Sequence, residues 1–304
     1  MKKSAILSAV LAMVAGCFGQ QTATTPAGAT QNAAAAPAPQ QGKRPPQAKT
    51  QPEFDAYQAA AANTDPVALE KAADDFAAKF PDSELRALLY RNSMRAYQNA
   101  NNGDKMLDVG HKILKIDPDD PEALIGVAEV LTERTRDTDL DKDQRYDEAM
   151  KAAERSIQTV DTDIIIPPGT PQEKVDEYKG SLKSTAYSII GAIQLNGGKY
   201  ADAEASFHKS LDAFPSSPDP VVVLRLAIAL DKQNRYPDAL KVANQAVALT
   251  QDNTASGTLA RRERDRLVQL TGGAAPSAAP ASAPAGAPGA APSTTATPPK
   301  APGA

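Results

Sequence analysis

The chain has 304 residues, and its 33 lysine and arginine residues against 37 aspartate and glutamate residues give a formal net charge of −4. This balance argues against a nucleic-acid-binding protein, whose contact surface would be basic. One cysteine and two histidines exclude a disulfide framework and leave few side chains for catalytic or metal chemistry. We therefore expect neither enzymatic activity nor a cofactor.

Residues 1–19 have the features of a secretory signal peptide. Two lysines precede an apolar run over residues 5–16, which is shorter than the roughly 20 residues that a membrane-spanning helix needs. Residues 14–17, Val-Ala-Gly-Cys, end the run and resemble the lipobox of bacterial lipoproteins. The resemblance implies that Cys17 is lipidated and anchors an exported protein in the cell envelope. Cleavage after Gly19 would instead remove the cysteine and leave a periplasmic chain without this anchor.

Two low-complexity segments flank the central part of the chain. Residues 20–51 contain mainly alanine, glutamine, proline and threonine, and residues 272–304 contain mainly alanine, proline, glycine and serine. Neither segment has the apolar side chains that a core requires, so we expect a disordered linker and a disordered tail. The folded domain is therefore predicted over residues 52–271.

Apolar residues recur every three or four positions through most of this domain and predict a succession of helices. The expected ranges are 53–62, 66–80, 84–100, 104–116, 123–132, 146–160, 171–196, 220–233 and 236–250. A run of three isoleucines, residues 164–166, follows the sixth of these helices and precedes two prolines. The run either folds back onto the core or forms an exposed apolar knob for a partner.

The clearest helical hairpin lies over residues 187–217. Apolar and small residues recur on both sides of Asn196-Gly197-Gly198, where glycine can adopt the left-handed conformation that ends a helix. The small residues Gly191 and Ala203 let the two helices approach each other, with the bulk of Phe207 beside them. Neither helix can bury its apolar face alone, so the hairpin needs neighbours of the same kind.

This hairpin closely resembles the tetratricopeptide repeat, whose signature places bulky, small and aromatic residues and a closing proline at fixed offsets. The matching positions are Tyr187, Gly191, Tyr200, Ala203, Phe207 and Pro215, whereas Gln194 and Ser210 depart from the pattern. Met94 and Ala128 are one family period of 34 residues apart. The resemblance implies an all-α solenoid of about five helical hairpins, which ends in a capping helix.

The capping helix is predicted near residues 259–270. We interpret Leu259, Leu267 and Leu270 as one apolar stripe that packs on the solenoid. Four arginines, at positions 261, 262, 264 and 266, would lie above this stripe. A polar outer face is what the last helix of a solenoid requires.

In the tetratricopeptide family, the first helices of successive hairpins line a concave groove that takes an extended peptide or a partner helix. The resemblance therefore implies a non-catalytic scaffold that binds another protein. The groove positions on two helices are Arg91, Arg95 and Asn99, and Val221, Leu224 and Ile228. The first set is a polar stripe suited to a carboxylate-bearing partner, and the second set is apolar. Alternatively, the polar set is only a solvated stripe on its helix, and the apolar set belongs to the core.

An acidic stretch in the loop before residue 146 provides a second hypothesis. The carboxylates are Asp137, Asp139, Asp141, Asp143 and Glu148, and the last lies 11 residues after the first. This spacing matches the oxygen ligands of an EF-hand, although Lys142 stands where the sharp turn of that loop needs glycine. The alternative function is thus a calcium-dependent structural module, against the interpretation of a plain acidic loop.

Overall fold

The computed structural model describes residues 42–272. The predicted signal peptide, Cys17, most of the predicted linker and nearly all of the predicted tail lie outside the described residues. The described chain forms eleven α-helices, and its only β-type pairing is an isolated bridge between Lys43 and Ile165.

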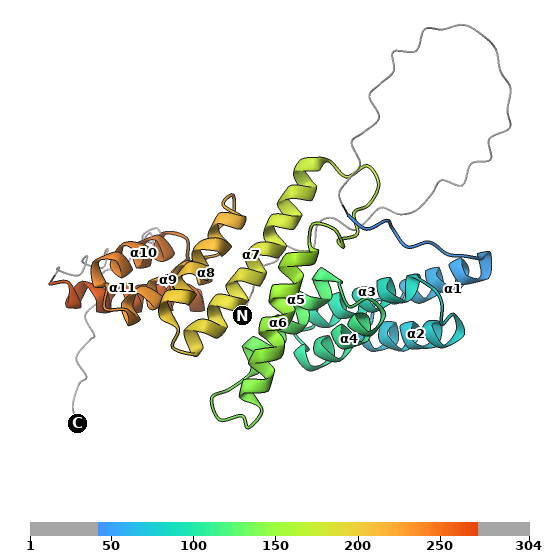
Figure 1. The fold of residues 1–304 in the computed structure, drawn as a ribbon, viewed down its shortest axis with the longest axis horizontal. Coiled ribbons are helices and arrows are strands. Elements are labelled where there is room, and N and C mark those ends of the chain that lie inside the picture. Colours follow the sequence, from blue (N-terminus) through green and yellow to red (C-terminus); the bar gives the residue numbers. More distant parts are fainter. Residues whose placement is uncertain (1–41, 273–304) are drawn as a thin grey trace, which may run out of the picture.

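The helices follow one another as five hairpins and one last helix, stacked in chain order from α1 at one end to α11 at the other (Figure 1). The hairpins are α1 (Gln51–Ala61) with α2 (Pro66–Lys79), α3 (Leu85–Asn99) with α4 (Gly103–Ile116), α5 (Pro121–Arg134) with α6 (Lys142–Thr159), α7 (Gln172–Asn196) with α8 (Tyr200–Ala213), and α9 (Pro220–Lys232) with α10 (Tyr236–Ala248), before α11 (Ala255–Leu270). The prediction of an all-α solenoid with a C-terminal capping helix is confirmed.

The odd-numbered helices form one layer of the solenoid and the even-numbered helices form the other. Helix α1 contacts α3, α5 contacts α7, α7 contacts α9, and α9 contacts α11. Within residues 42–272, no comparable contact joins consecutive even-numbered helices. A stack whose helices lie closer together on one side curves toward that side. The odd-numbered layer is therefore the inner, concave layer.

Three of the hairpin turns share one backbone conformation. Asn101, Gly198 and Asn234 have positive φ angles of 55°, 74° and 60°. In each turn the following residue donates its backbone N–H to the carbonyl oxygen five residues earlier, at 2.8–3.1 Å. Asparagine adopts the left-handed conformation more readily than other residues with a side chain. The two asparagines thus take the place of glycine, and three hairpins close with the same geometry.

The core of the α7–α8 hairpin depends on a close approach between its two helices. Phe207 is completely buried, and a Cβ atom placed on Gly191 would lie only 2.6 Å from its ring. Glycine is therefore required at position 191 unless the ring moves. Alanine has the same role nearby, because Ala203, Ala239 and Ala243 are also completely buried between helices.

Residues 42–50 differ from the disordered linker that was expected there, because they lie along the first three hairpins. The backbone N–H of Lys43 donates to the carbonyl oxygen of Ile164 at 2.8 Å, and its ammonium pairs with Asp117 at 2.8 Å. Farther along, the ammonium of Lys49 donates to the carbonyl oxygen of Asp82 at 2.8 Å. These partners are separated widely in sequence, so composition alone did not indicate the contacts.

The isoleucine run and the leucines of the last helix differ in how far they are buried. Ile164 and Ile166 are buried, so the isoleucine run folds back onto the core and is not an exposed knob. Of the three leucines predicted to form a stripe on the last helix, only Leu267 is buried, whereas Leu259 and Leu270 are 51% and 49% exposed. The predicted single apolar stripe on α11 is therefore wrong, because residues 259 and 270 lie on the side of the helix that faces away from α9 and α10.

Phe207→Ala should lower the free energy of unfolding by roughly 3–5 kcal/mol, because it removes a completely buried ring and leaves a cavity. Urea unfolding followed by circular dichroism would measure this change. Leu270→Ala is the control and should change stability by less than about 0.5 kcal/mol, since the side chain is half exposed. Similar losses from both variants would contradict the packing described for α7 and α8.

Candidate functional site

The predicted polar stripe on α3 is already engaged inside the protein. Arg91 is only 4% exposed, and its guanidinium forms an ion pair with the completely buried Asp120. One turn along, Arg95 pairs with Glu122. The hydroxyl group of Tyr178, on α7, donates to the other oxygen of Glu122 at 2.6 Å. The stripe is thus the first part of a polar network that links α3, α5 and α7.

The start of α5 explains why these carboxylates are in place. Asp120 precedes Pro121, and its side chain caps the helix by accepting the N–H groups of Glu122 and Ala123 at 3.1 and 3.0 Å. A carboxylate at this position also interacts favourably with the helix dipole. Arg91 therefore meets a carboxylate that local backbone geometry has already oriented.

The Glu122–Arg95 pair is held in its charged form, whereas burial raises the pKa of the Asp120 carboxyl above its ordinary value. Burial opposes ionisation of the Glu122 carboxyl, but the positive charges of Arg95 and Arg91 outweigh it, so the pKa lies below its ordinary value. Burial also opposes the charged form of Arg95, yet attraction to Glu122 raises the pKa of that guanidinium. The carboxylates that the two arginines hold are therefore the protein's own, which corrects the expectation that they hold a partner's carboxylate.

The remaining predicted groove positions have different surroundings. Asn99 is exposed at the end of α3. On α9, Leu224 is buried, whereas Val221 and Ile228 are partly exposed. The predicted apolar stripe on α9 is thus only partly accessible, at Val221 and Ile228, and Ile228 also packs against the buried cluster that contains Ala246 and Ala260. The arginines of the inner layer are neutralised near its middle.

The carboxylates of the acidic loop are engaged with other groups of the protein. Asp137 pairs with Lys142 at 2.8 Å, Asp141 pairs with Arg145 at 2.7 Å, and Asp139 accepts a backbone N–H. Glu148 is directed to His111 on α4, at 2.8 Å. In the part of the chain that the structure describes, no three metal-ligating side chains come together. The carboxylates that match the EF-hand spacing, Asp143 among them, therefore do not converge on a common centre. The calcium hypothesis has no support.

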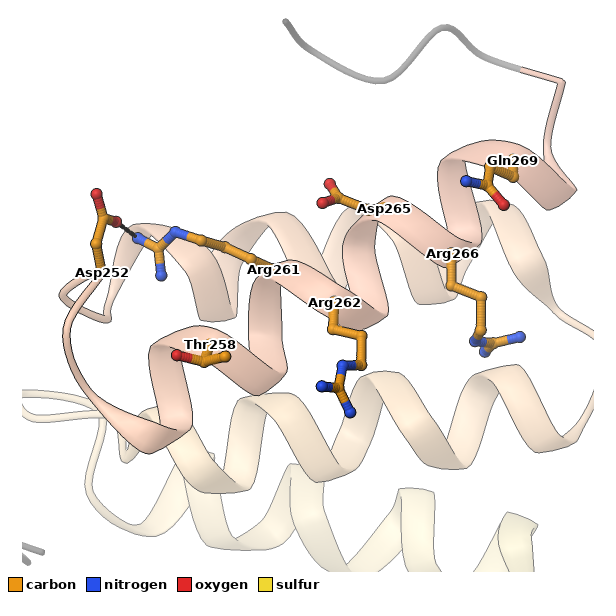
Figure 2. Close-up of a pocket in the computed structure, with 7 residues that line it drawn as sticks. All are labelled: Asp252, Thr258, Arg261, Arg262, Asp265, Arg266 and Gln269. Carbon is orange, nitrogen blue, oxygen red and sulfur yellow. Dashed lines mark ion pairs between the residues drawn. The ribbon is translucent and has the colours of Figure 1, made fainter. Parts of the chain in front are cut away.

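A shallow hollow of about 600 Å³ runs along α11 (Figure 2) and was not predicted from the sequence. The residues that line it are Asp252, Thr258, Arg261, Arg262, Asp265, Arg266 and Gln269. Arg261 pairs with Asp252, as the dashed line in Figure 2 marks. Arg262 and Arg266 extend to the same side of the helix (Figure 2). The hollow is thus rich in arginine.

Comparison with known families agrees with this architecture. Residues 195–262, from the end of α7 into α11, match the family model described as tetratricopeptide repeat. Within this range the chain matches the tetratricopeptide repeat. The match includes the turn at Gly198 and the buried Phe207, which are the features that the sequence resemblance was based on.

Solved structures with this fold include PilF of Pseudomonas aeruginosa, with 18% sequence identity and a TM-score of 0.50, covering 73% of this chain and 87% of that chain. A tetratricopeptide protein of Thermus thermophilus has 14% identity and a TM-score of 0.41, covering 72% and 98%. At such identities the likeness concerns the fold alone. No curated protein matches the chain in sequence. Among the described helices, none is long and apolar enough to cross a bilayer.

Arg91→Met should lower the free energy of unfolding by roughly 3–5 kcal/mol, because it leaves the buried charge of Asp120 without its partner. The matched control is Arg44→Met, which removes a mostly exposed arginine from its pair with Glu84 and should cost at most about 1 kcal/mol. Chemical denaturation of both variants would measure the difference. Equal losses would show that the α3–α5 network is no stronger than a surface ion pair.

Proposed function

We propose that this protein is a non-catalytic scaffold that binds another protein on its inner layer. The observation that carries the proposal is the concave layer of odd-numbered helices, on which Val221 and Ile228 keep apolar surface accessible. An apolar stripe on a concave helical surface suits the apolar face of a partner helix or an extended peptide. The tetratricopeptide fold alone argues only for a binding surface, so the site is argued from these residues.

The polar network shifts the expected contact toward the C-terminal part of the layer. Arg91 and Arg95 are held by Asp120 and Glu122, so a partner's carboxylate would have to displace buried ion pairs. Breaking such a pair is costly, because it leaves a buried charge uncompensated. A partner that contacts the stripe on α9 would not have to break an ion pair. We therefore place the partner's main contact on α9 and expect it to be apolar.

A photo-activatable cross-linking residue in place of Ile228 should give adducts with a partner protein in living cells. The same residue in place of Lys241, which is exposed on α10 in the outer layer, is the matched control and should give none. Gel shifts detected with an antibody to the protein would measure both. Adducts from both positions, or from Lys241 alone, would contradict binding on the inner layer.

The same proposal places the protein in the bacterial cell envelope, exported by residues 1–19 and anchored through Cys17. The support is the signal-like composition of this segment and the lipobox-like residues before the cysteine. Anchoring would hold the scaffold at a membrane surface, where one lipid-modified terminus takes the place of a spanning helix.

Expression of the full chain in bacteria with radiolabelled palmitate should give a labelled protein in the membrane fraction. Cys17→Ser should abolish the label and release the protein, because the thiol is the point of lipid attachment. A conservative change outside the motif, Ser8→Thr, should leave both unchanged. An unlabelled wild-type protein in the soluble periplasmic fraction would support cleavage after Gly19 instead.

A further inference from the structure

Among residues 42–272, helix α11 lacks the partner helix that every other odd-numbered helix has. Each of α1, α3, α5, α7 and α9 is followed by an even-numbered helix that packs on it, and α11 is the last helix among residues 42–272. Counted from the start of each helix, Arg262 of α11 and Ala227 of α9 are both the eighth residue. Ala227 is completely buried in the cluster that includes Ala239 and Ala243 of α10. Arg262 therefore marks the place where a further helix would lie.

The hollow along α11 coincides with this place. Thr258, Arg261 and Asp265 line the hollow, and they are the fourth, seventh and eleventh residues of the helix. On α9 the same positions are Val223, Leu226 and Leu230, all of which are buried. The face that is apolar in the complete hairpin is thus polar and open on α11.

Apolar side chains lie along one edge of this open face. Leu259 is 51% exposed and Leu270 is 49% exposed. Residues 259, 262, 266 and 270 are three or four positions apart, so they form one continuous row on the helix surface. A helix that served only to shield the solenoid from water would be expected to present polar residues there. The combination of exposed leucines and arginines is that of an amphipathic contact surface.

The charge of this face is positive. Helix α11 contains four arginines and two acidic residues. Arg261 is paired with Asp252, and Arg266 is paired with Asp231 at 2.6 Å and with Glu263 at 2.8 Å. Arg262 is exposed and has no ion-pair partner among the described residues. Its planar guanidinium can therefore take a carboxylate in a bidentate fashion.

We propose that the α11 surface, formed by Thr258, Leu259, Arg262, Arg266, Gln269 and Leu270, binds an acidic amphipathic helix of another protein. The bound helix takes the position beside α11 that α10 takes beside α9. Its carboxylates face Arg262 and its apolar residues cover Leu259 and Leu270. This surface lies on α11 and is separate from the stripe on α9, so it adds a second binding surface to the proposed scaffold.

Two features favour an acidic helix over other occupants. Residues 273–304 contain no aspartate or glutamate, so the side chains of this segment cannot supply the carboxylates. A hollow also fits a rounded helix better than a flat bilayer.

The test uses the full chain and a fluorescent synthetic peptide with glutamates on one helical face and leucines on the other. Arg262→Glu should weaken binding about tenfold, because an attractive pair becomes a repulsive one. Lys241→Glu makes the same charge change on exposed α10 and should leave affinity within about twofold. A peptide with glutamine in place of glutamate should also bind about tenfold more weakly. Fluorescence anisotropy would measure each affinity, and circular dichroism would check folding.

Amide hydrogen exchange should show protection by the peptide within residues 255–270. Equal weakening by both charge variants, equal affinity for the glutamine peptide, or protection confined to α9 would each overturn the proposal. Vesicles of phosphatidylcholine and phosphatidylglycerol are the second probe. If they bind the protein through Arg262 and the peptide does not compete, the α11 surface binds a membrane and the proposal is overturned. Protection confined to α9 would leave the inner-layer scaffold intact, so the two proposals fail separately.

Discussion

The close approach of paired helices is the constraint on which the rest of the structure depends. A hairpin of two short helices has too little apolar surface to fold alone, and it becomes stable only when its neighbours cover both sides. With no tryptophan in the chain, the contacts are made largely by alanine, glycine and aliphatic residues, and Phe207 packs closely against Gly191. Small residues allow short interhelical distances, and these distances permit five hairpins to stack as one continuous body.

The inner layer then carries a different kind of interaction. Ion pairs from Arg91 to Asp120 and from Arg95 to Glu122 join α3 to α5, and Tyr178 extends the network to α7. Buried charges of this kind add little net stability compared with apolar packing, but they are costly to break once formed. The network therefore specifies how successive hairpins are placed, and it removes the arginines from the surface that a partner can reach.

The two ends of the solenoid show how a repeat protein can separate its binding surfaces. Near the N-terminus, residues 42–50 run along the first three hairpins and join loops that are far apart in sequence. At the other end, α11 has an arginine-rich face, and no second helix completes its hairpin within the described residues. The apolar stripe on α9 lies between these ends. The proposed scaffold would thus offer two separate surfaces to partner proteins.

The amino-acid sequence by itself determined the helices, their order and the repeat. Helical spacing, capping aspartates before proline and the left-handed turn at Gly198 are local signals, because each depends on a few neighbouring residues. Asn101 and Asn234 carry the same turn signal in a weaker form. Only the tertiary structure decided what each helix face meets. Periodicity showed that Arg91 and Arg95 share a face, but their partners Asp120 and Glu122 lie about one repeat away in sequence. For the same reason Leu259 and Leu267 could not be told apart, since burial depends on which neighbour packs against which side of a helix.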